Sequence, residues 1–354
     1  MKEWNMKSAI YKGIKTMACE EHAKPSLIES DDAIIRVVRA CVCGSDLWFF
    51  RDGCEADTQT GHEAIGVVES VGGDVTIAKP GDFVIVPFPY SCGECPVCKA
   101  GFESSCPHGG YFGGEGLGCQ AQYLRVPHAN GTLVVVPGEA KSFTDEQLAD
   151  LLALSDVMPT GYHAAASAEV KPGDTVVVFG DGAVGLCGVL SAKIRGARRI
   201  IAMSRHADRQ ALAREFGATD IVEERGDEAV ARVMEMTDGY GADAVLECVG
   251  SALSNDTAMK VARCGAVVGR VGLPHGVEAD IPGLFYRNVG LRGGPAPVRH
   301  YDTAVDHLLD LVLNGEIHPG RVFTAEFTLD DIQAAYDAMD QRKTIKSLLR
   351  VSEV

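Results

Sequence analysis

The chain has 354 residues, which is too many for one ordinary hydrophobic core and suits two domains. Its hydrophobic content of 46% and its 40 glycines are typical of a globular protein with many tight turns, not of a disordered chain. A formal net charge of −16, without a long basic tract, argues against nucleic acids and anionic membranes as partners, because both attract clusters of Lys and Arg.

No apolar run approaches the roughly 18 residues that cross a membrane. The first 13 residues have neither an apolar core nor a small-residue cleavage pattern, so we expect no signal peptide and a cytoplasmic location. Because thiols stay reduced there, the 12 cysteines of this chain indicate metal ligands more than disulfides.

Short β-like runs broken by Gly and Pro fill the chain up to about residue 137. They lie at 33–40, 64–71, 82–87 and 133–136, and a further strand-like segment begins at Met6. Such runs predict an irregular, mostly β domain.

From about residue 148 apolar strands alternate with helices, a pattern typical of a parallel sheet buried on both faces. The predicted strands are 175–179, 199–203, 221–222, 244–248, 266–269 and 289–291, and the helices are 183–195 and 207–216. An amphipathic helix at 303–313 and a strand at 347–351 follow.

This order predicts an α/β protein in which a Rossmann-type, doubly wound domain is inserted into a mostly β catalytic domain formed from both chain ends. We place the catalytic domain at 1–157 and 296–354, and the dinucleotide-binding domain at 158–295.

A glycine-rich turn joins the strand 175–179 to the helix after it. Gly180 permits the tight turn, Gly182 lets the backbone approach a pyrophosphate, and Gly185 lets the helix pack on the strand, with Ala183 and Val184 at the helix start. The pyrophosphate is expected at the positive end of this helix. A tight turn without a ligand is the alternative.

The next strand ends in Ser204 and Arg205, with Arg209 one helical turn further on. An NAD-binding fold usually has Asp or Glu near this point, to accept hydrogen bonds from the ribose. A hydroxyl and a guanidinium favour a 2′-phosphate instead, so we predict NADP(H) rather than NAD(H). An ordinary surface arginine is the alternative.

Four closely spaced cysteines predict a closed zinc site: Cys92, Cys95, Cys98 and Cys106. Four thiolates surround one Zn²⁺ tetrahedrally and leave no open position, as in a structural site. Two disulfides or an iron–sulfur cluster are the alternatives, although the repeated i, i+3 spacing suits a metal loop better.

Cys43 and His62 are both good zinc ligands, but two such residues alone are weak evidence for a site. The chain as a whole resembles the medium-chain, zinc-containing alcohol dehydrogenases. The matching pieces run in the family's order: CVCGSD at 41–46, GHEAIGVVESVG at 61–72, KPGDFVIV at 79–86, the four-cysteine loop, TGYHAA at 160–165, KPGDTVVVFGDGAVG at 171–185 and KSLLRV at 346–351.

The resemblance implies a GroES-like catalytic domain in which Cys43 and His62 bind a catalytic zinc. Many members have a cysteine as third ligand, where this chain has Asp156; a carboxylate also binds zinc. Glu63 would be a neighbouring carboxylate or an alternative ligand. Asp46 matches the acid that hydrogen-bonds the ring of His62 and fixes its tautomer.

Ser45 matches the family's hydroxyl that takes the proton from the alcohol, although capping a helix is its alternative role. Several members have a histidine three residues later that passes the proton on, whereas this chain has Trp48, which cannot relay it. With Phe49 and Phe88, Trp48 predicts a moderately apolar pocket, although such clusters are more often core.

By position in the family, further residues are expected at the cofactor: Thr160 beside the nicotinamide, Lys346 near the pyrophosphate, and Gly250, Val271 and Leu273 at the nicotinamide ribonucleotide.

These expectations predict a zinc-dependent oxidoreductase that moves a hydride between NADP(H) and a small alcohol, aldehyde or ketone, with two zinc ions per chain. An NAD-linked formaldehyde or polyol dehydrogenase, and a non-catalytic zinc- or NADPH-binding sensor, are the alternatives. The partners expected are a small-molecule substrate and further copies of the chain, as a homodimer or homotetramer.

Overall fold

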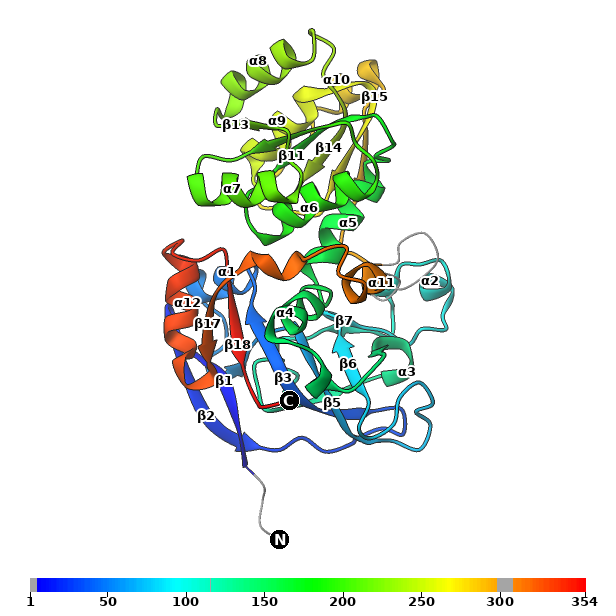
Figure 1. Ribbon diagram of the computed structural model, residues 1–354, viewed down its shortest axis with the longest axis vertical. Helices are drawn as coiled ribbons and strands as arrows, with labels where there is room; N and C mark the ends of the chain where they lie inside the picture. Colours follow the sequence, from blue (N-terminus) through cyan, green and yellow to red (C-terminus); the bar gives the residue numbers. More distant parts are fainter. Residues whose placement is uncertain (1–4, 115, 298–307) are drawn as a thin grey trace. The chain divides into compact units, whose positions relative to one another are not determined.

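The computed structural model describes residues 5–114, 116–297 and 308–354. The chain divides into two compact units, Met1–Asp156 with Pro297–Val354, and Val157–Ala296. In Figure 1 the blue beginning and the red end of the chain belong to the same unit, and the yellow strands to the other. Within the described ranges, no helix is both long and apolar enough to pass through a membrane.

The first unit is built mainly from strands. Its main sheet has the order β10-β6-β5-β3-β18-β17, with β9 also paired to β3, and smaller sheets join β2-β1-β4 and β7-β8. The strands are β1 (Asn5–Gly13), β2 (Thr16–Ala23), β3 (Ala33–Val42), β4 (Thr58–Gln59), β5 (Ala64–Val71), β6 (Phe83–Val86), β7 (Pro89–Tyr90), β8 (Gly110–Tyr111), β9 (Tyr123–Val126), β10 (Val134–Val136), β17 (Phe323–Thr328) and β18 (Lys346–Arg350).

Helices and single turns complete this unit: α1 (Asp46–Asp52), α2 (Pro96–Lys99), α3 (Ala129–Thr132), α4 (Asp145–Ala153), α11 (Leu308–Leu313) and α12 (Ile332–Asp340), with 3-10 turns at Glu103–Ser105, Ala140–Ser142, Pro319–Val322 and Leu329–Asp331. Strand β3 is buried along almost its whole length, because β5, β9 and β18 flank it and α12 packs in the same core. The register of β18 on β3 places Ser347 beside Val42, next to Cys43.

The second unit is a parallel sheet of order β13-β12-β11-β14-β15-β16. Figure 1 shows α6 and α7 on one side of this sheet, and α9 and α10 on the other. Its elements are α5 (Val157–Ser167), β11 (Thr175–Phe179), α6 (Ala183–Ile194), β12 (Arg199–Met203), α7 (Ala207–Phe216), β13 (Asp220–Val222), α8 (Gly226–Met236), β14 (Ala242–Glu247), α9 (Ala252–Val261), β15 (Ala262–Arg270), α10 (Ile281–Arg287) and β16 (Gly290–Gly293).

The order of this sheet reverses between β11 and β14, which is where open α/β sheets bind ligands at the carboxyl ends of their strands. Strands β11 and β12 read as continuous apolar runs because helices cover both faces. The predicted fold class, a Rossmann-type domain with a mostly β domain, is confirmed.

Several predicted elements have the observed bounds, namely β5, β11, β12 and α7. Other predictions were wrong in extent: β14 starts two residues earlier and ends at Glu247, and β15 already begins at Ala262. Of the helix predicted at 303–313, residues 303–307 lie outside the described residues, and α11 begins at Leu308. Helix α5 was not predicted because it is buried on nearly every face, which leaves no helical alternation of apolar and polar residues.

Gly185 and Gly182 provide a matched test of the turn between β11 and α6. A Cβ on Gly185 would meet the carbonyl oxygen of Gly180 well inside van der Waals contact, whereas a Cβ on Gly182 would meet nothing within 4 Å. We expect Gly185→Ala to lower the free energy of unfolding by roughly 1–3 kcal/mol, the usual cost of overpacking, despite the better helix propensity of Ala. Thermal melting of both variants measures this; equal melting temperatures would contradict the packing role.

Candidate active site

Four cysteine thiols face one another around α2. The sulfur–sulfur distance is 3.5 Å for Cys95–Cys98 and Cys92–Cys106, and 3.9 Å for Cys92–Cys98 and Cys95–Cys106. A disulfide requires about 2.05 Å, whereas four sulfurs bound at about 2.3 Å to one zinc ion lie about 3.8 Å apart. These distances fit a tetrahedral zinc, and all four residues are free cysteines, so the disulfide alternative fails.

Backbone amides donate hydrogen bonds to two of the four sulfurs. The amide of Cys98 donates a hydrogen bond to Cys95 Sγ at 3.4 Å, and the amide of His108 donates one to Cys106 Sγ at 3.4 Å. The Cys98 amide and the neighbouring thiols lower the pKa of Cys95 to about 7. A thiol with a lowered pKa gives up its proton to a metal more readily.

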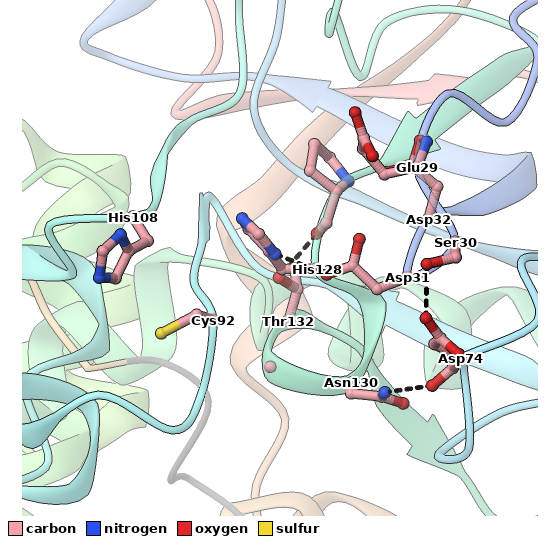
Figure 2. Close-up of polar contacts among 12 residues, drawn as sticks. Glu29, Ser30, Asp31, Asp32, Asp74, Cys92, His108, His128, Asn130 and Thr132 are labelled. Atoms are coloured by element: carbon pink, nitrogen blue, oxygen red, sulfur yellow. Dashed lines mark hydrogen bonds and ion pairs between the residues drawn. The ribbon is translucent and has the colours of Figure 1, made fainter.

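Helix α3 anchors the beginning of the four-cysteine loop. Figure 2 shows Cys92 near this helix, where the Thr132 hydroxyl donates to the Pro127 carbonyl at 3.1 Å. Thr132 also accepts a hydrogen bond from the amide of Ser91 at 3.1 Å. On the other side of α3 the Asn130 amide donates to the Asp74 carbonyl at 2.8 Å. The loop is therefore tied to the body of the unit by backbone and side-chain hydrogen bonds.

A second group consists of Cys43, His62, Glu63 and Asp156, from each of which one ligand atom lies within 4.8 Å of the others. They come from the end of β3, the segment before β5 and the turn after α4. Asp156 Oδ2 lies 3.8 Å from Cys43 Sγ and 3.5 Å from His62 Nε2. Ligands of a tetrahedral zinc with bonds of about 2.0–2.3 Å are about 3.3–3.8 Å apart, so the donor set fits zinc.

Asp46 lies behind this group, where it was expected. One carboxylate oxygen is 3.2 Å from His62 Nδ1, and the other accepts a hydrogen bond from the amide of Cys43 at 2.9 Å. Burial lowers the pKa of His62, but the negative groups Asp46 and Cys43 raise it by more, so that it stands well above its usual value. Such surroundings favour a cation among these residues.

Glu63 forms a buried ion pair with Lys346, at 2.6 Å between Oε1 and Nζ, and both side chains are 1% exposed. The other oxygen, Oε2, has no hydrogen-bond partner among the described residues. Burial raises the pKa of Glu63, and the charge of Lys346 opposes that rise. Lys346, which the resemblance expects near a pyrophosphate, has its ammonium buried against Glu63 and the Val42 carbonyl.

Sequence reasoning missed a buried network behind Asp46. Gln120 donates from its amide to Asp46 Oδ2 at 3.3 Å and to the Cys41 carbonyl at 2.9 Å. Its amide oxygen accepts hydrogen bonds from the hydroxyls of Thr60, at 2.6 Å, and Tyr336, at 3.0 Å. A lone Gln and a Tyr near the opposite end of the chain give no signal in a sequence.

Ser45 is the N-cap residue of α1, but its exposed side chain makes no capping hydrogen bond. The alternative role of a helix-capping hydroxyl is therefore not realised. Trp48, on the same helix, is 38% exposed.

The predicted aromatic group separates into two environments. The ring of Phe88 lies 6.4 Å from that of His62, edge to face, and stacks on Tyr111 at 5.8 Å. Phe49 instead packs edge to face on Tyr11 at 6.0 Å, against the hydrophobic core. Phe88 thus belongs to the surroundings of the metal group, whereas Phe49 packs against the core, as the alternative interpretation expects.

The glycine-rich turn has the geometry of a phosphate-binding loop. Gly180 has φ of 111°, a conformation that favours glycine, and α6 begins at Ala183 with Val184 in its first turn. The open space beside Gly182 at this helix N-terminus fits a pyrophosphate, because free backbone N–H groups there bind anions.

The predicted phosphate-binding side chains lie next to this loop, at the end of β12. Ser204 is buried, and its hydroxyl donates to Asp181 Oδ2 at 2.8 Å. Arg209 donates to Asp181 Oδ1 at 3.2 Å, whereas Arg205 is exposed. The structure therefore adds a carboxylate, Asp181, that the motif did not draw attention to.

Two loops meet at the carboxyl ends of β14 and β15. Gly250 has φ of 86°, and a Cβ there would overlap the Leu273 backbone. The buried Glu247 accepts hydrogen bonds from the amide of Gly250 at 2.9 Å and from the Ser254 hydroxyl at 2.7 Å, while the Val271 amide donates to the Glu247 carbonyl at 2.9 Å. Gly250, Val271 and Leu273 thus come together. Thr160 is buried in α5.

Two family models match this chain. Residues 29–138 match the alcohol dehydrogenase GroES-like domain, and residues 183–309 match the zinc-binding dehydrogenase domain.

Relatives share nearly the whole length. A zinc-type alcohol dehydrogenase-like protein of Bacillus subtilis is 35% identical, with 95% of this chain and 97% of the relative covered. The glutathione-independent formaldehyde dehydrogenase of Bacillus subtilis is 30% identical, with 95% and 94% covered. The solved structure of an alcohol dehydrogenase from Thermus sp. ATN1 has a TM-score of 0.88 at 31% identity and covers 98% of this chain and 100% of its own. The chain therefore belongs to the medium-chain zinc alcohol dehydrogenases and is an alcohol dehydrogenase-like oxidoreductase.

Proposed function

We propose that the protein transfers a hydride between NADP(H) and a small alcohol, aldehyde or ketone. The observation that supports this most directly is the convergence of Cys43, His62 and Asp156, with Glu63 beside them. Ser45, which is exposed, follows Cys43 by two residues in the chain. We assign a catalytic zinc to this group and a structural zinc to the four cysteines. A cytoplasmic location and a homodimer or homotetramer remain predictions.

When bound, the catalytic zinc supplies Lewis acidity, which lowers the pKa of an alcohol or polarises a carbonyl. The chain's own residues prepare the site. Asp46 holds His62 by its Nδ1, so that Nε2 points to the ligand group. Glu63 keeps a second carboxylate close by, and its charge is balanced by Lys346.

Ser45 is the group that receives the substrate proton in this proposal. Its hydroxyl is exposed and makes no capping hydrogen bond. Trp48 follows one turn later, and an indole N–H only donates, so the proton leaves Ser45 by another route. Phe88 next to His62 favours a moderately apolar substrate.

The dinucleotide is assigned to the second unit. The turn around Gly182 would hold the pyrophosphate, and Thr160 with Gly250, Val271 and Leu273 would contact the nicotinamide half. Ser204, Arg205 and Arg209 support a 2′-phosphate, because guanidinium groups form charge-assisted bonds with it.

An NAD-linked formaldehyde or polyol dehydrogenase is the second candidate. One argument for it is the likeness to the formaldehyde dehydrogenase of Bacillus subtilis. Another is the Asp181 carboxylate at the end of β12, because a carboxylate at this place accepts hydrogen bonds from the ribose of NAD. A panel of alcohols, polyols and aldehydes, assayed with both cofactors, separates the two. Highest kcat/KM with NAD⁺ and formaldehyde or a polyol would overturn the first proposal.

A non-catalytic sensor is the alternative from another class. Intact ligand groups at both sites argue against it. Metal analysis should find about two zinc ions per chain; one zinc and no turnover would favour the sensor.

Removing one ligand from each group should have different consequences. We expect Cys43→Ala to reduce kcat by about a thousandfold or more while the protein stays folded, because Lewis acidity contributes several kcal/mol to catalysis. Cys95→Ala should lower the melting temperature first, since a structural zinc stabilises the fold. Zinc content, kcat and thermal melting measure this, with Cys54→Ala, an exposed thiol outside both groups, as control. Equal unfolding of both ligand variants would contradict the division of roles.

Reversing the charge of Arg205 should change the cofactor preference. We expect Arg205→Asp to lower kcat/KM for NADPH by about tenfold to a hundredfold more than for NADH, because it replaces attraction to a 2′-phosphate by repulsion. Arg214→Asp is the matched control, since Arg214 is an exposed arginine further along α7. An unchanged NADPH-to-NADH ratio in Arg205→Asp would mean that Arg205 is an ordinary surface charge.

A further inference from the structure

Asp181 is the residue between the first two glycines of the phosphate loop, and its carboxylate points to the end of β12. Oδ2 accepts a hydrogen bond from the Ser204 hydroxyl at 2.8 Å. Oδ1 accepts one from Arg209 at 3.2 Å, and the main-chain carbonyl of Asp181 accepts another at 3.2 Å. The Asp181 and Arg209 side chains are 19% and 13% exposed, and Ser204 is fully buried.

These two donors are the ones that a 2′-phosphate on the adenosine ribose would need. A hydroxyl and a guanidinium at the end of the second strand bind such a phosphate by donating to its oxygens. In this structure both already donate to the oxygens of Asp181. The Asp181 carboxylate therefore accepts the two hydrogen bonds that a 2′-phosphate would otherwise accept.

Arginines and carboxylates both lie around Asp181. Arg225, in the loop after β13, is partly buried; burial and the charge of Arg205 lower its pKa, while Asp181, Glu223 and Glu224 raise it. These effects put Arg205 and Arg225 within electrostatic range of each other, and Arg225 within range of Asp181 as well.

We propose that Asp181 is a specificity-determining residue that competes with the 2′-phosphate of NADP(H) for Ser204 and Arg209, and so narrows the preference for NADP(H) over NAD(H). The inference rests on the cofactor site proposed above. A 2′-phosphate must draw the two donors away from Asp181 and tolerate its charge nearby, whereas the neutral 2′-hydroxyl of NAD(H) need not. Binding of NAD(H) is therefore little affected by the carboxylate.

Asp181→Asn tests this on the full-length protein, because the amide keeps the shape of the side chain and removes its charge. The readout is equilibrium binding, by titration calorimetry, of adenosine 2′,5′-bisphosphate and of 5′-AMP, which differ only in the 2′-phosphate. We expect the affinity for the bisphosphate to rise about tenfold, as is usual when a charge-assisted hydrogen bond becomes available to a ligand, and that for AMP to change less than about twofold.

Asp208→Asn is the matched control. It removes the same charge one residue before Arg209, and among the described residues Asp208 makes no hydrogen bond to Ser204 or Arg209. If Asp208→Asn raised the bisphosphate affinity as much as Asp181→Asn does, the inference would be overturned, since removal of any nearby negative charge would then suffice. Asp181→Ala is a second variant, in which the same rise is expected without an amide that offers hydrogen bonds of its own.

The background variant Arg209→Ala separates competition from simple repulsion. If Asp181 acts by holding Arg209, the rise caused by Asp181→Asn becomes smaller in that background. If Asp181→Asn raises the bisphosphate affinity by the same factor in the Arg209→Ala background, competition for Arg209 is overturned. A loss of AMP affinity in Asp181→Asn, without a rise for the bisphosphate, also overturns the inference, because Asp181 would then be a ribose acceptor.

The cofactor proposal and this inference fail in different ways. An unchanged bisphosphate-to-AMP ratio in Asp181→Asn, with a wild-type protein that prefers the bisphosphate, refutes the role of Asp181 and leaves NADP(H) in place. A wild-type protein that binds both fragments equally and turns over NADH best refutes the NADP(H) proposal. In that case a ratio raised by Asp181→Asn still supports the role of Asp181.

Discussion

The Asp46 carboxylate joins two of the three chain segments that supply the candidate metal group. It receives the amide of Cys43, the ring of His62 and the side chain of Gln120, all from different parts of the first unit. Burying a carboxylate is costly unless donors surround it, so loss of any one of these contacts destabilises the others. By engaging Nδ1 it turns Nε2 of His62 toward Asp156. Asp46, which is not itself a candidate ligand, thus sets the orientation of the His62 ring.

The pair of Glu63 and Lys346 is a second constraint, and it ties the end of the chain to the first unit. Strand β18 pairs with β3 and brings the Lys346 ammonium to a carboxylate that is otherwise buried without compensation. Loss of one partner from a buried pair usually costs about 3–5 kcal/mol, because the remaining charge has no partner. Among the described residues, Glu63 Oε2 has no hydrogen-bond partner. Glu63 itself belongs to the group of candidate metal ligands.

In the second unit one short turn serves packing and recognition together. Gly185 lets α6 approach the backbone of Gly180, and Gly182 leaves space at the helix N-terminus. Between Gly180 and Gly182, the Asp181 carboxylate accepts hydrogen bonds from Ser204 and Arg209, so the same loop also carries a negative charge. Backbone geometry thus shapes the open side of the turn, and side-chain charge shapes the side that faces the end of β12.

The sequence by itself determined the fold class, because alternating apolar strands and helices, glycine spacing and cysteine spacing are local patterns. It also determined the family, through motifs such as CVCGSD and GHEAIG, and the closed cysteine group, whose members lie within a few residues of one another. Only the tertiary structure decided that Lys346 pairs with Glu63 and that Phe49 packs against the core. It also decided that Gln120 and Tyr336 support Asp46, and that Ser204 and Arg209 donate hydrogen bonds to Asp181. The physical reason is distance along the chain: periodicity and spacing report neighbours in sequence, whereas buried charges and hydrogen-bond donors find partners that only the packing of remote segments brings within reach.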